Sequence, residues 1–194
     1  MKKLLILGIG LAMFSPFLSC NAYPPTEARI FQNRVNFNTM LTTYPELRDA
    51  KIRLVPAFAE KLMVCEVIGD KKCSTRISSY EPGNDTSYIQ KDIIPFSLQY
   101  NVIHEFGHHI YFAEMPQWAR DKWVRLWNNH PNHVSPYCKH SPWEAFAEWF
   151  AVYKYNLRDT NQYGTYDGVE SVFDSPQGKF MDTVYPLYRK PLQK

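Results

Sequence analysis

Apolar positions recur at helical spacing in one early segment of the chain and then fall into short runs. From Thr26 to Thr43 apolar side chains return every three or four residues, which predicts an amphipathic helix. The helix should end at Tyr44, because a residue before proline disfavours the helical backbone. The apolar runs that follow are short, and turn residues separate them, as is typical of strands. We expect these strands at residues 52–55, 62–68, 76–80 and 87–94.

The second half of the chain has a helical pattern instead. No proline interrupts residues 97–114, and the aromatic-rich segment 117–129 follows a Met-Pro stop. We interpret the tryptophans of that second segment as core residues rather than as a ligand site. A further helix should begin at Ser141 and extend for about four turns. Ser141 has the cap position, Pro142 lies at the first helical position, and Glu144 follows three residues after the cap.

Ser175 and Pro176 are expected to open a last helix near residues 179–187, which Pro186 should break. One helix and several short strands, followed by a run of helices, is the pattern of an α+β protein. We therefore expect one α+β domain of about 170 residues, with a small mixed sheet in front and a mainly helical C-terminal part.

The beginning of the chain has the pattern of a secretory signal peptide. Lys2 and Lys3 are followed by an apolar run at residues 4–18, and small residues come next. The run is too short to cross a membrane as a helix. We therefore predict a signal peptide at 1–22 and a folded domain at 23–194, in a protein that is secreted or held in the cell envelope.

Two modes of processing are open. Cleavage after Ala22 would release the domain, whereas Leu18, Ser19 and Cys20 resemble the end of a bacterial lipoprotein signal, in which the cysteine is lipidated. Phe17 stands where that signal normally has leucine, so we favour simple export. Membrane attachment is expected only if Cys20 carries a lipid.

The charge of the chain gives no sign of a nucleic-acid partner. The formal net charge is +3, and it falls to +1 when Lys2 and Lys3 leave with the signal peptide. A nucleic-acid-binding surface usually needs a clustered basic face. No run of basic residues in this chain exceeds two, so we expect no nucleic-acid partner.

Three cysteines follow the signal peptide. Cys65 and Cys73 flank a segment with Gly-Asp turn chemistry, and a disulfide that closes this loop suits an exported protein. The alternative is two independent buried thiols. Cys138 is left without a necessary role, although a thiol can also bind zinc.

The strongest chemical signal is the segment His104-Glu105-Phe106-Gly107-His108. Residues four apart are about one helical turn apart, so both imidazoles face the same side and can hold one ion. Imidazole suits zinc, and catalytic zinc sites leave one position open for water. Glu105 lies next to the first ligand and can act as a base toward that water. With 6 histidines in 194 residues, chance predicts roughly 0.01 such patterns.

Two further residues adjoin the ligand pair. Gly107 lies inside the expected helix, where glycine costs about 0.5–1 kcal/mol relative to alanine, and close approach of another element would justify it. His109 points about 100° away from His108. We interpret His109 as a bystander, with contact to a substrate as the alternative.

A third metal ligand is expected from Glu144 or Glu148. Both lie on one face of the helix that follows Ser141, among apolar residues. Two other roles are open, because Glu144 has the position of a capping-box glutamate and Glu148 can be a solvated surface residue. Further candidate ligands are His130, His133, Cys138 and His140.

HEFGH, followed by EAFAE on a later helix, resembles the catalytic domain of the anthrax lethal factor family. These gluzincin metalloproteases include secreted proline-specific endopeptidases. The resemblance covers about residues 97–155 and implies a zincin-like metalloprotease fold. It also implies one catalytic Zn²⁺ bound by His104, His108 and Glu144, and a supporting role for Glu148, which orients a ligand histidine.

The same family places a tyrosine seven residues before the ligand glutamate, where its hydroxyl assists at the oxyanion. In this chain that position is Tyr137. The resemblance therefore predicts Glu105 and Tyr137 as the catalytic residues. It also predicts that an edge strand within residues 87–94 pairs with an extended peptide substrate.

The predicted function is an exported zinc metalloendopeptidase that hydrolyses peptide bonds with a zinc-activated water and Glu105 as general base. Its partner should be a peptide or protein substrate, and we expect a monomer. Two alternatives share the metal site: a non-catalytic exported zinc-binding module and a metallohydrolase of another envelope component. Glu105 argues against the first alternative, because a structural zinc site has no use for a base.

Overall fold

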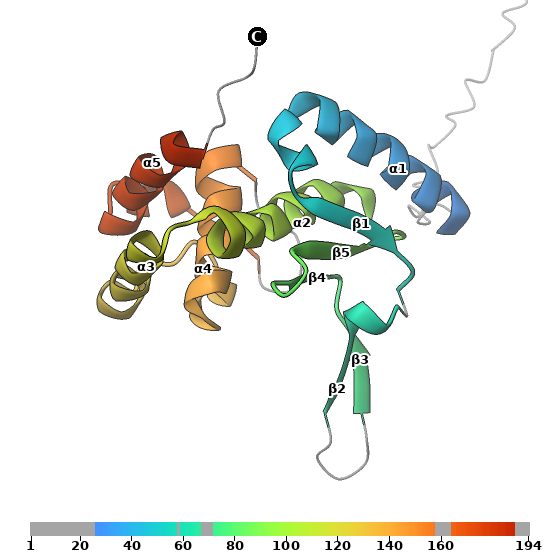
Figure 1. Ribbon diagram of the computed structural model, residues 1–194, viewed down its shortest axis with the longest axis horizontal. Helices are drawn as coiled ribbons and strands as arrows, with labels where there is room; N and C mark the ends of the chain where they lie inside the picture. Colours follow the sequence, from blue (N-terminus) through green and yellow to red (C-terminus); the bar gives the residue numbers. More distant parts are fainter. Residues whose placement is uncertain (1–25, 58, 67–71, 158–163, 189–194) are drawn as a thin grey trace, which may run out of the picture.

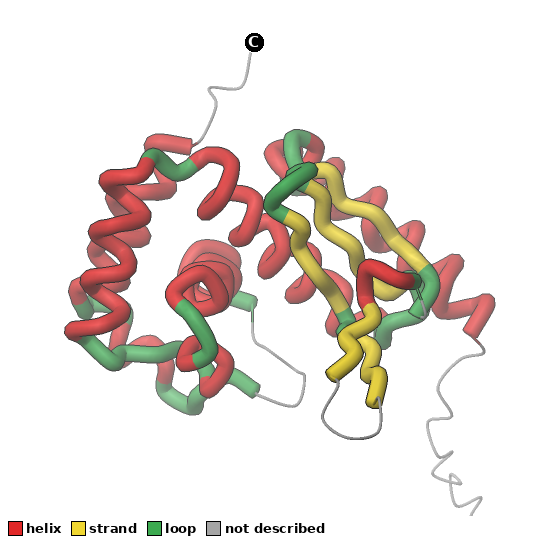
Figure 2. Tube along the Cα trace, turned by 60° about the horizontal axis from the view of Figure 1, so that its bottom comes forward, coloured by secondary structure: helices red, strands yellow, loops and turns green. Residues whose placement is uncertain are grey.

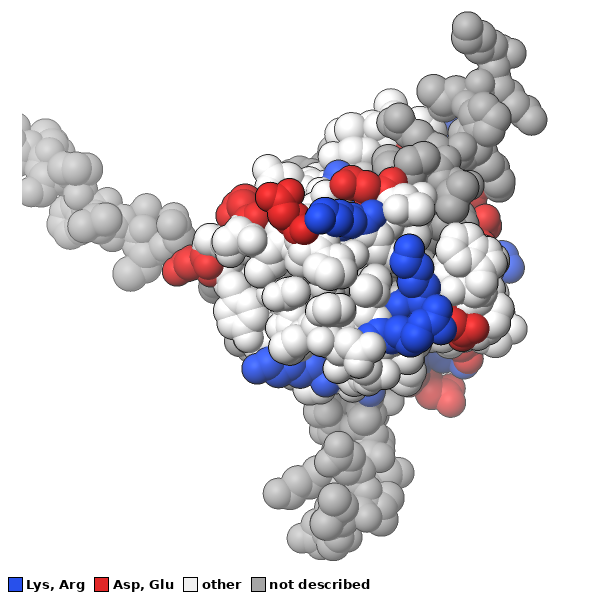
Figure 3. All heavy atoms as spheres, turned by 90° about the vertical axis from the view of Figure 1, so that its left-hand side faces the viewer, with Lys and Arg blue, Asp and Glu red and all other residues white. Residues whose placement is uncertain are grey.

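The computed structural model describes residues 26–57, 59–66, 72–157 and 164–188, which form a mixed α+β structure (Figure 1). The predicted signal peptide, with Cys20 and Ala22, lies outside the described residues. None of the described helices is long and apolar enough to cross a membrane. The face at the helical end carries acidic and basic side chains in separate small groups (Figure 3).

The helices and strands follow the predicted order with some shifts. The helices are α1 (Thr26–Thr43), α2 (Pro95–His109), α3 (Gln117–Asn129), α4 (Pro142–Trp149) and α5 (Pro176–Tyr188). The strands are β1 (Lys51–Val55), β2 (Met63–Glu66), β3 (Lys72–Thr75), β4 (Ser78–Glu81) and β5 (Thr86–Gln90). Short π-helical turns extend two helices: η3 (Ile110–Glu114) follows α2 and η5 (Phe150–Lys154) follows α4.

Three strands form a small mixed sheet in the order β1-β5-β4. Strand β1 runs parallel to β5, and β4 runs antiparallel to β5, with Tyr80 opposite Ser87. Strand β5 therefore lies in the middle of the sheet. The prediction of an edge strand within residues 87–94 is wrong, because both sides of β5 are already paired. The edge nearest helix α2 is β4, which packs against it.

Strands β2 and β3 form a separate antiparallel hairpin, which projects from the sheet (Figure 1). The sequence pattern gave no indication of β3. In the register of this hairpin Cys65 lies opposite Cys73. Opposed residues in antiparallel strands have Cα atoms about 4.5–5.5 Å apart, a separation that disulfides span. The disulfide itself stays a prediction.

The predicted helices are confirmed, but two of their ends differ. The expected helix at 97–114 begins earlier, at Pro95, and its last turn is the π-helical η3. Pro95 suits a helix start, because a proline in the first turn removes no hydrogen bond. Helix α5 begins at Pro176 and continues through Pro186, so the predicted break there is wrong.

Helix α2 joins the two halves of the molecule. It packs against α1, β4 and β5 and also against α4. The strands lie together at one side of the molecule, with helices behind and beside them (Figure 2). The buried Asn33 of α1 donates hydrogen bonds to the carbonyl oxygens of Lys91 and Ile93, at 3.0 and 2.8 Å. These bonds fix the segment that leads into α2, so that α1 positions the start of this helix.

Three tryptophans hold the loop between α3 and α4. Trp123 is fully buried and donates to the carbonyl oxygen of Pro142, at 2.6 Å. Trp127 donates to the carbonyl oxygen of Cys138, at 2.8 Å, and Trp149 of α4 donates to the carbonyl oxygen of Asn132, at 3.2 Å. Trp123 and Trp127 pack in or against the core, as expected, whereas Trp118 of the same helix is exposed.

The end of helix α2 and its η3 extension is capped by an arginine from the next helix. One Arg120 nitrogen donates to the carbonyl oxygens of Tyr111, Phe112 and Met115, at 3.2, 3.2 and 2.8 Å. The last carbonyl groups of a helix lack partners within the helix and carry the negative end of its dipole. Arg120 therefore stabilises the junction of η3 and α3.

Replacement of Arg120 by alanine should lower the free energy of unfolding by about 1.5–3 kcal/mol, because it removes charged hydrogen bonds from partly buried carbonyl groups. Denaturant unfolding followed by circular dichroism measures this loss. The matched control is Arg125→Ala on the exposed side of the same helix, which should change stability by less than about 0.5 kcal/mol. Equal effects of the two variants would contradict the capping role.

Candidate metal centre

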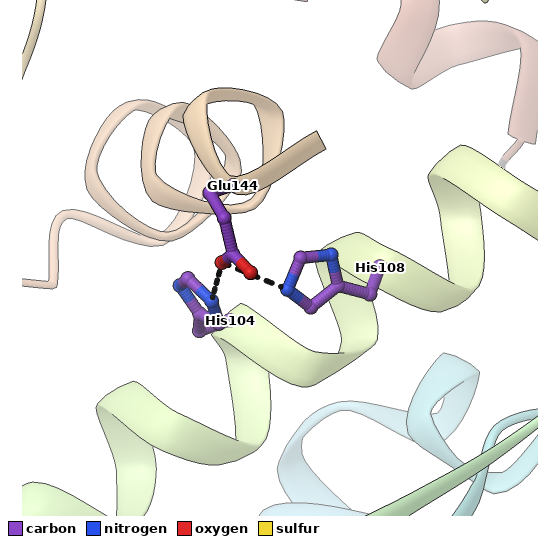
Figure 4. A group of neighbouring side chains, drawn as sticks. All are labelled: His104, His108 and Glu144. Atoms are coloured by element: carbon purple, nitrogen blue, oxygen red, sulfur yellow. Dashed lines mark hydrogen bonds and ion pairs between the residues drawn. The ribbon is translucent and has the colours of Figure 1, made fainter. Parts of the chain in front are cut away.

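Helix α2 presents two imidazoles on one side. His104 and His108 are separated by one helical turn, and their ring centroids lie 4.9 Å apart with an interplanar angle of 83°. Both side chains are buried, with 6% and 5% of the residue exposed. They face helix α4 (Figure 4). The i, i+4 spacing therefore acts as predicted, because it brings two potential ligands to one point.

Helix α4 brings the third group. The Glu144 carboxylate lies between the two rings, with its Oε2 atom 3.2 Å from Nε2 of His104 and 3.2 Å from Nε2 of His108 (Figure 4). Ser141 caps the helix and accepts a hydrogen bond from the Glu144 backbone, at 3.1 Å. The backbone of Glu144 thus belongs to the cap, while its carboxylate is turned toward the histidines.

The three groups fit a divalent metal ion. Their ligand atoms all lie within 4.8 Å of one another, and within the described part of the chain this is the group of three that can hold an ion. Tetrahedral ligands about 2.0 Å from zinc lie about 3.3 Å from each other. The 3.2 Å separations between Glu144 and each histidine match that spacing. His104, His108 and Glu144 can therefore hold a metal ion.

Comparison of the chain with protein-family models, curated proteins and solved structures gives no match. The chemistry of the site therefore has to be argued from its own geometry.

Glu148 supports the site from behind His104. It is 1% exposed, and its Oε1 atom lies 2.9 Å from Nδ1 of His104. The angle of this contact departs from that of a good hydrogen bond. Tyr100 and Ser135 donate hydroxyl hydrogen bonds to the same carboxylate. The alternative of a solvated Glu148 is wrong, because the side chain is buried among three polar partners.

Glu105 lies on the other side of His104 in the sequence and is also buried, at 2% exposure. Its Oε2 atom has no hydrogen-bond partner. Burial raises the pKa of the Glu105 carboxyl above its ordinary value, although the nearby charges of His108 and His104 oppose the shift. A buried carboxylate oxygen without a partner is costly, so the site keeps a reactive group at the expense of stability.

Tyr137 lies in the loop between α3 and α4, in the short helical turn η4 (Pro136–Lys139). Its ring centroid is 6.0 Å from that of His104 and 4.7 Å from that of His140. Tyr137 is therefore brought to the metal-binding residues, as predicted. Cys138 is buried, and burial raises the pKa of its thiol to about 12, which disfavours the thiolate that binds zinc.

The charges of the site balance one another without a metal ion. Burial lowers the pKa of His104, but hydrogen bonds to Glu144 and Glu148 outweigh burial and raise it well above its ordinary value. For Glu144, burial raises the pKa, whereas hydrogen bonds to His104 and His108 dominate and lower it. The metal-free site is thus an ion pair in which a proton occupies a position that a metal ion can take.

Several supporting residues were not predicted from the sequence. Tyr100 lies on α2 four residues before His104, so its helical spacing was a usable signal. Ser135, Tyr80 and Asp85 reach the site from distant segments, and no spacing rule connects them with HEFGH.

Gly107 permits the close contact between the two helices. A Cβ atom at this position would lie 2.8 Å from Cα of Ala147 and 3.3 Å from Cβ of Phe150. Real Cβ atoms essentially never approach a backbone atom that closely. The expected close approach of another element is confirmed, and that element is α4, which carries Glu144.

Gly107→Ala should push α4 away from α2, because the clash is with backbone rather than with a flexible side chain. We expect a loss of about 1–3 kcal/mol in the free energy of unfolding and weaker zinc binding. Unfolding curves and zinc titrations test both effects. Gly83→Ala is the matched control, since a Cβ there meets nothing within 4 Å. A Gly107→Ala variant with unchanged zinc affinity would contradict this packing argument.

Metal binding should release protons. In the metal-free protein the raised pKa of His104 keeps its imidazole protonated at pH 7, so a metal ion on Nε2 must displace that proton. We expect release of about one proton per ion at pH 7, and a metal affinity that increases with pH until His104 is neutral. Calorimetry in buffers with different ionisation enthalpies counts the protons. Binding without proton release would show that the His104 imidazole is already neutral in the metal-free protein.

Proposed function

We propose that this protein is an exported zinc metalloendopeptidase of the gluzincin type, with a zincin-like domain after its signal peptide. The observation that carries the proposal is the group formed by His104, His108 and Glu144 with the buried, partly unpartnered carboxylate of Glu105 beside it. Two imidazoles and a carboxylate are the ligands of many catalytic zinc sites. The resemblance of HEFGH and EAFAE to the anthrax lethal factor family supports the same activity.

The arrangement of helices and sheet also supports the proposal. A small mixed sheet lies along α2, and its edge strand β4 is antiparallel to its neighbour. An extended peptide can add to such an edge through backbone hydrogen bonds. In this proposal β4 replaces the segment 87–94 as the strand that holds the substrate, and the substrate is a peptide or protein.

Each catalytic residue has a defined task. A bound Zn²⁺ would supply Lewis-acid chemistry, lowering the pKa of a water molecule and polarising the scissile carbonyl. Glu105 takes a proton from the attacking water and gives it to the leaving amine. Its raised pKa suits this exchange, because the group must both accept and release the proton. Tyr137 donates a hydrogen bond to the developing oxyanion, and Glu148 holds the His104 ring in place.

Two alternative functions use the same residues: a non-catalytic exported zinc-binding module and a metallohydrolase that acts on another envelope component. The buried Oε2 of Glu105 without a hydrogen-bond partner favours catalysis over the module, since a structural site gains nothing from an unsatisfied carboxylate. The choice between peptide and other substrates depends on the assay below.

Glu105→Gln should abolish cleavage while zinc stays bound. The amide cannot accept the proton of the attacking water, so we expect turnover of a broad peptide library to fall by at least about a hundredfold. Zinc content is measured on the same sample. Chelator-sensitive cleavage by the wild type, lost in this variant, supports the peptidase.

Glu144→Ala is the companion variant, because it removes the proposed ligand and leaves the base. Zinc stoichiometry should fall together with activity. Cleavage that persists in Glu105→Gln would remove the base assignment. A loss of helix stability alone in Glu144→Ala, with full zinc content, would show that this glutamate serves only the helix cap.

A further inference from the structure

The two histidines of the metal site are held in different ways. Neither buried Nδ1 atom has a hydrogen-bond partner, but Nδ1 of His104 forms an ion pair with the Glu148 carboxylate, at 2.9 Å. The ion pair of His108, with Glu144, is formed by its Nε2 atom. The His108 ring also stacks with the Tyr80 ring, at 5.9 Å and an interplanar angle of 22°. Tyr80 belongs to strand β4, so the sheet as well as Glu144 of α4 supports this second imidazole.

Tyr80 is itself fixed by an aspartate at the turn between β4 and β5. Its hydroxyl donates to Oδ1 of Asp85, at 2.7 Å, and its ring also stacks with Phe112, at 5.6 Å. The same Asp85 oxygen lies 2.7 Å from Nδ1 of His109. One carboxylate oxygen therefore connects a side chain of β4 with a side chain of α2.

The backbone at Asp85 indicates that its side chain is needed. Its φ is +53°, a left-handed conformation that carries a steric cost for residues other than glycine, although a smaller one for aspartate than for most. Glycine would remove that cost. An aspartate at this position offers what glycine lacks, namely an acceptor for Tyr80 and His109.

His109 is buried, as expected of a residue with a structural role rather than of a bystander. It is 3% exposed, and its ring stacks with Phe106, at 5.7 Å and 17°. Its Nε2 atom is 3.7 Å from Glu114, a weaker contact than the one with Asp85. The side chain points away from the metal ligands, as the helical geometry predicts, and toward the turn that follows β4.

We propose that Asp85 is a positioning residue for the metal site. Through His109 it fastens the β4–β5 turn to α2, and through Tyr80 it holds an aromatic ring against His108. This contact helps to orient His108, which lacks the second carboxylate contact that Glu148 gives to His104. The proposal rests on the metal site of the proposed function, but it does not depend on peptide hydrolysis.

Asp85→Gly tests the proposal, because it removes the carboxylate and also relieves the left-handed backbone. We expect about tenfold weaker zinc binding in a chelator competition and a changed absorption spectrum of the Co²⁺-substituted protein. Hydrogen exchange of the β4 amides should become about tenfold faster. Asp85→Asn keeps the backbone preference and an acceptor oxygen, so it should stay within about twofold of the wild type in zinc affinity and exchange.

A second pair of variants tests the other partner. His109→Phe keeps the ring that packs on Phe106 and removes the nitrogen, so it should reproduce the effects of Asp85→Gly. His109→Asn places an amide nitrogen close to the position of Nδ1 and should restore wild-type zinc affinity. The double variant of Asp85→Gly and His109→Phe should bind zinc no more weakly than Asp85→Gly alone, because Asp85→Gly already breaks the connection that His109→Phe breaks.

Unchanged zinc affinity, Co²⁺ spectrum and β4 exchange in Asp85→Gly and His109→Phe would overturn the proposal and leave Asp85 as a turn residue. The result of this test can be distinguished from the result of the peptide-cleavage assay. Tenfold weaker zinc binding in these variants, in a protein that cleaves no peptide, supports the positioning role and overturns the proposed peptidase. Peptide cleavage by the wild type, with zinc affinity unchanged in the variants, supports the proposed peptidase and overturns the positioning role.

Discussion

The close packing of helix α4 on helix α2 at Gly107 is the constraint on which the site depends. The ligand histidines lie on one helix and the ligand glutamate on the other, so the distance between the helices sets the distance between their side chains. A methyl group at Gly107 would collide with the Ala147 backbone, and the Glu144 carboxylate would then lie too far from the imidazoles. The glycine costs about 0.5–1 kcal/mol of helix stability. The packing of two buried helix faces offsets this cost.

Bringing these groups together also creates an electrostatic problem. Glu105, Glu144 and Glu148 lie close together in a buried region with only two imidazoles beside them, and an unpaired buried charge is strongly destabilising. Hydroxyl groups of Tyr100 and Ser135 satisfy the Glu148 carboxylate, and the histidines compensate Glu144. Of the three carboxylates, Glu105 keeps a buried oxygen without a hydrogen-bond partner. That carboxylate is the one to which the proposed function assigns proton transfer.

The sequence was most informative where the signal was local. HEFGH specified two ligands because both lie one turn apart on a helix, and the Ser141-Pro142 start correctly specified the helix that carries Glu144. Strand pairing was harder, because an apolar run shows that a strand exists but not which strands lie beside it. The prediction of an edge strand within residues 87–94 is wrong for this reason, because β5 pairs on both sides. The contacts of Asp85 could not be predicted from the sequence for the same reason, since they join the β4–β5 turn to a helix more than twenty residues away.

Because the two histidines are held by different contacts, we expect the position of His104 to be fixed more firmly than that of His108. On the α4 side, His104 forms an ion pair with a buried carboxylate, and hydroxyl hydrogen bonds from Tyr100 and Ser135 hold that carboxylate. On the β4 side, His108 has an aromatic contact, worth about 0.5–1.5 kcal/mol, from a strand at the edge of the sheet. The same strand is the one on which the proposed function places the peptide. Backbone hydrogen bonds from a substrate to β4 would restrict the motion of Tyr80 and thereby of His108. Substrate binding and metal binding should therefore strengthen each other through this one strand.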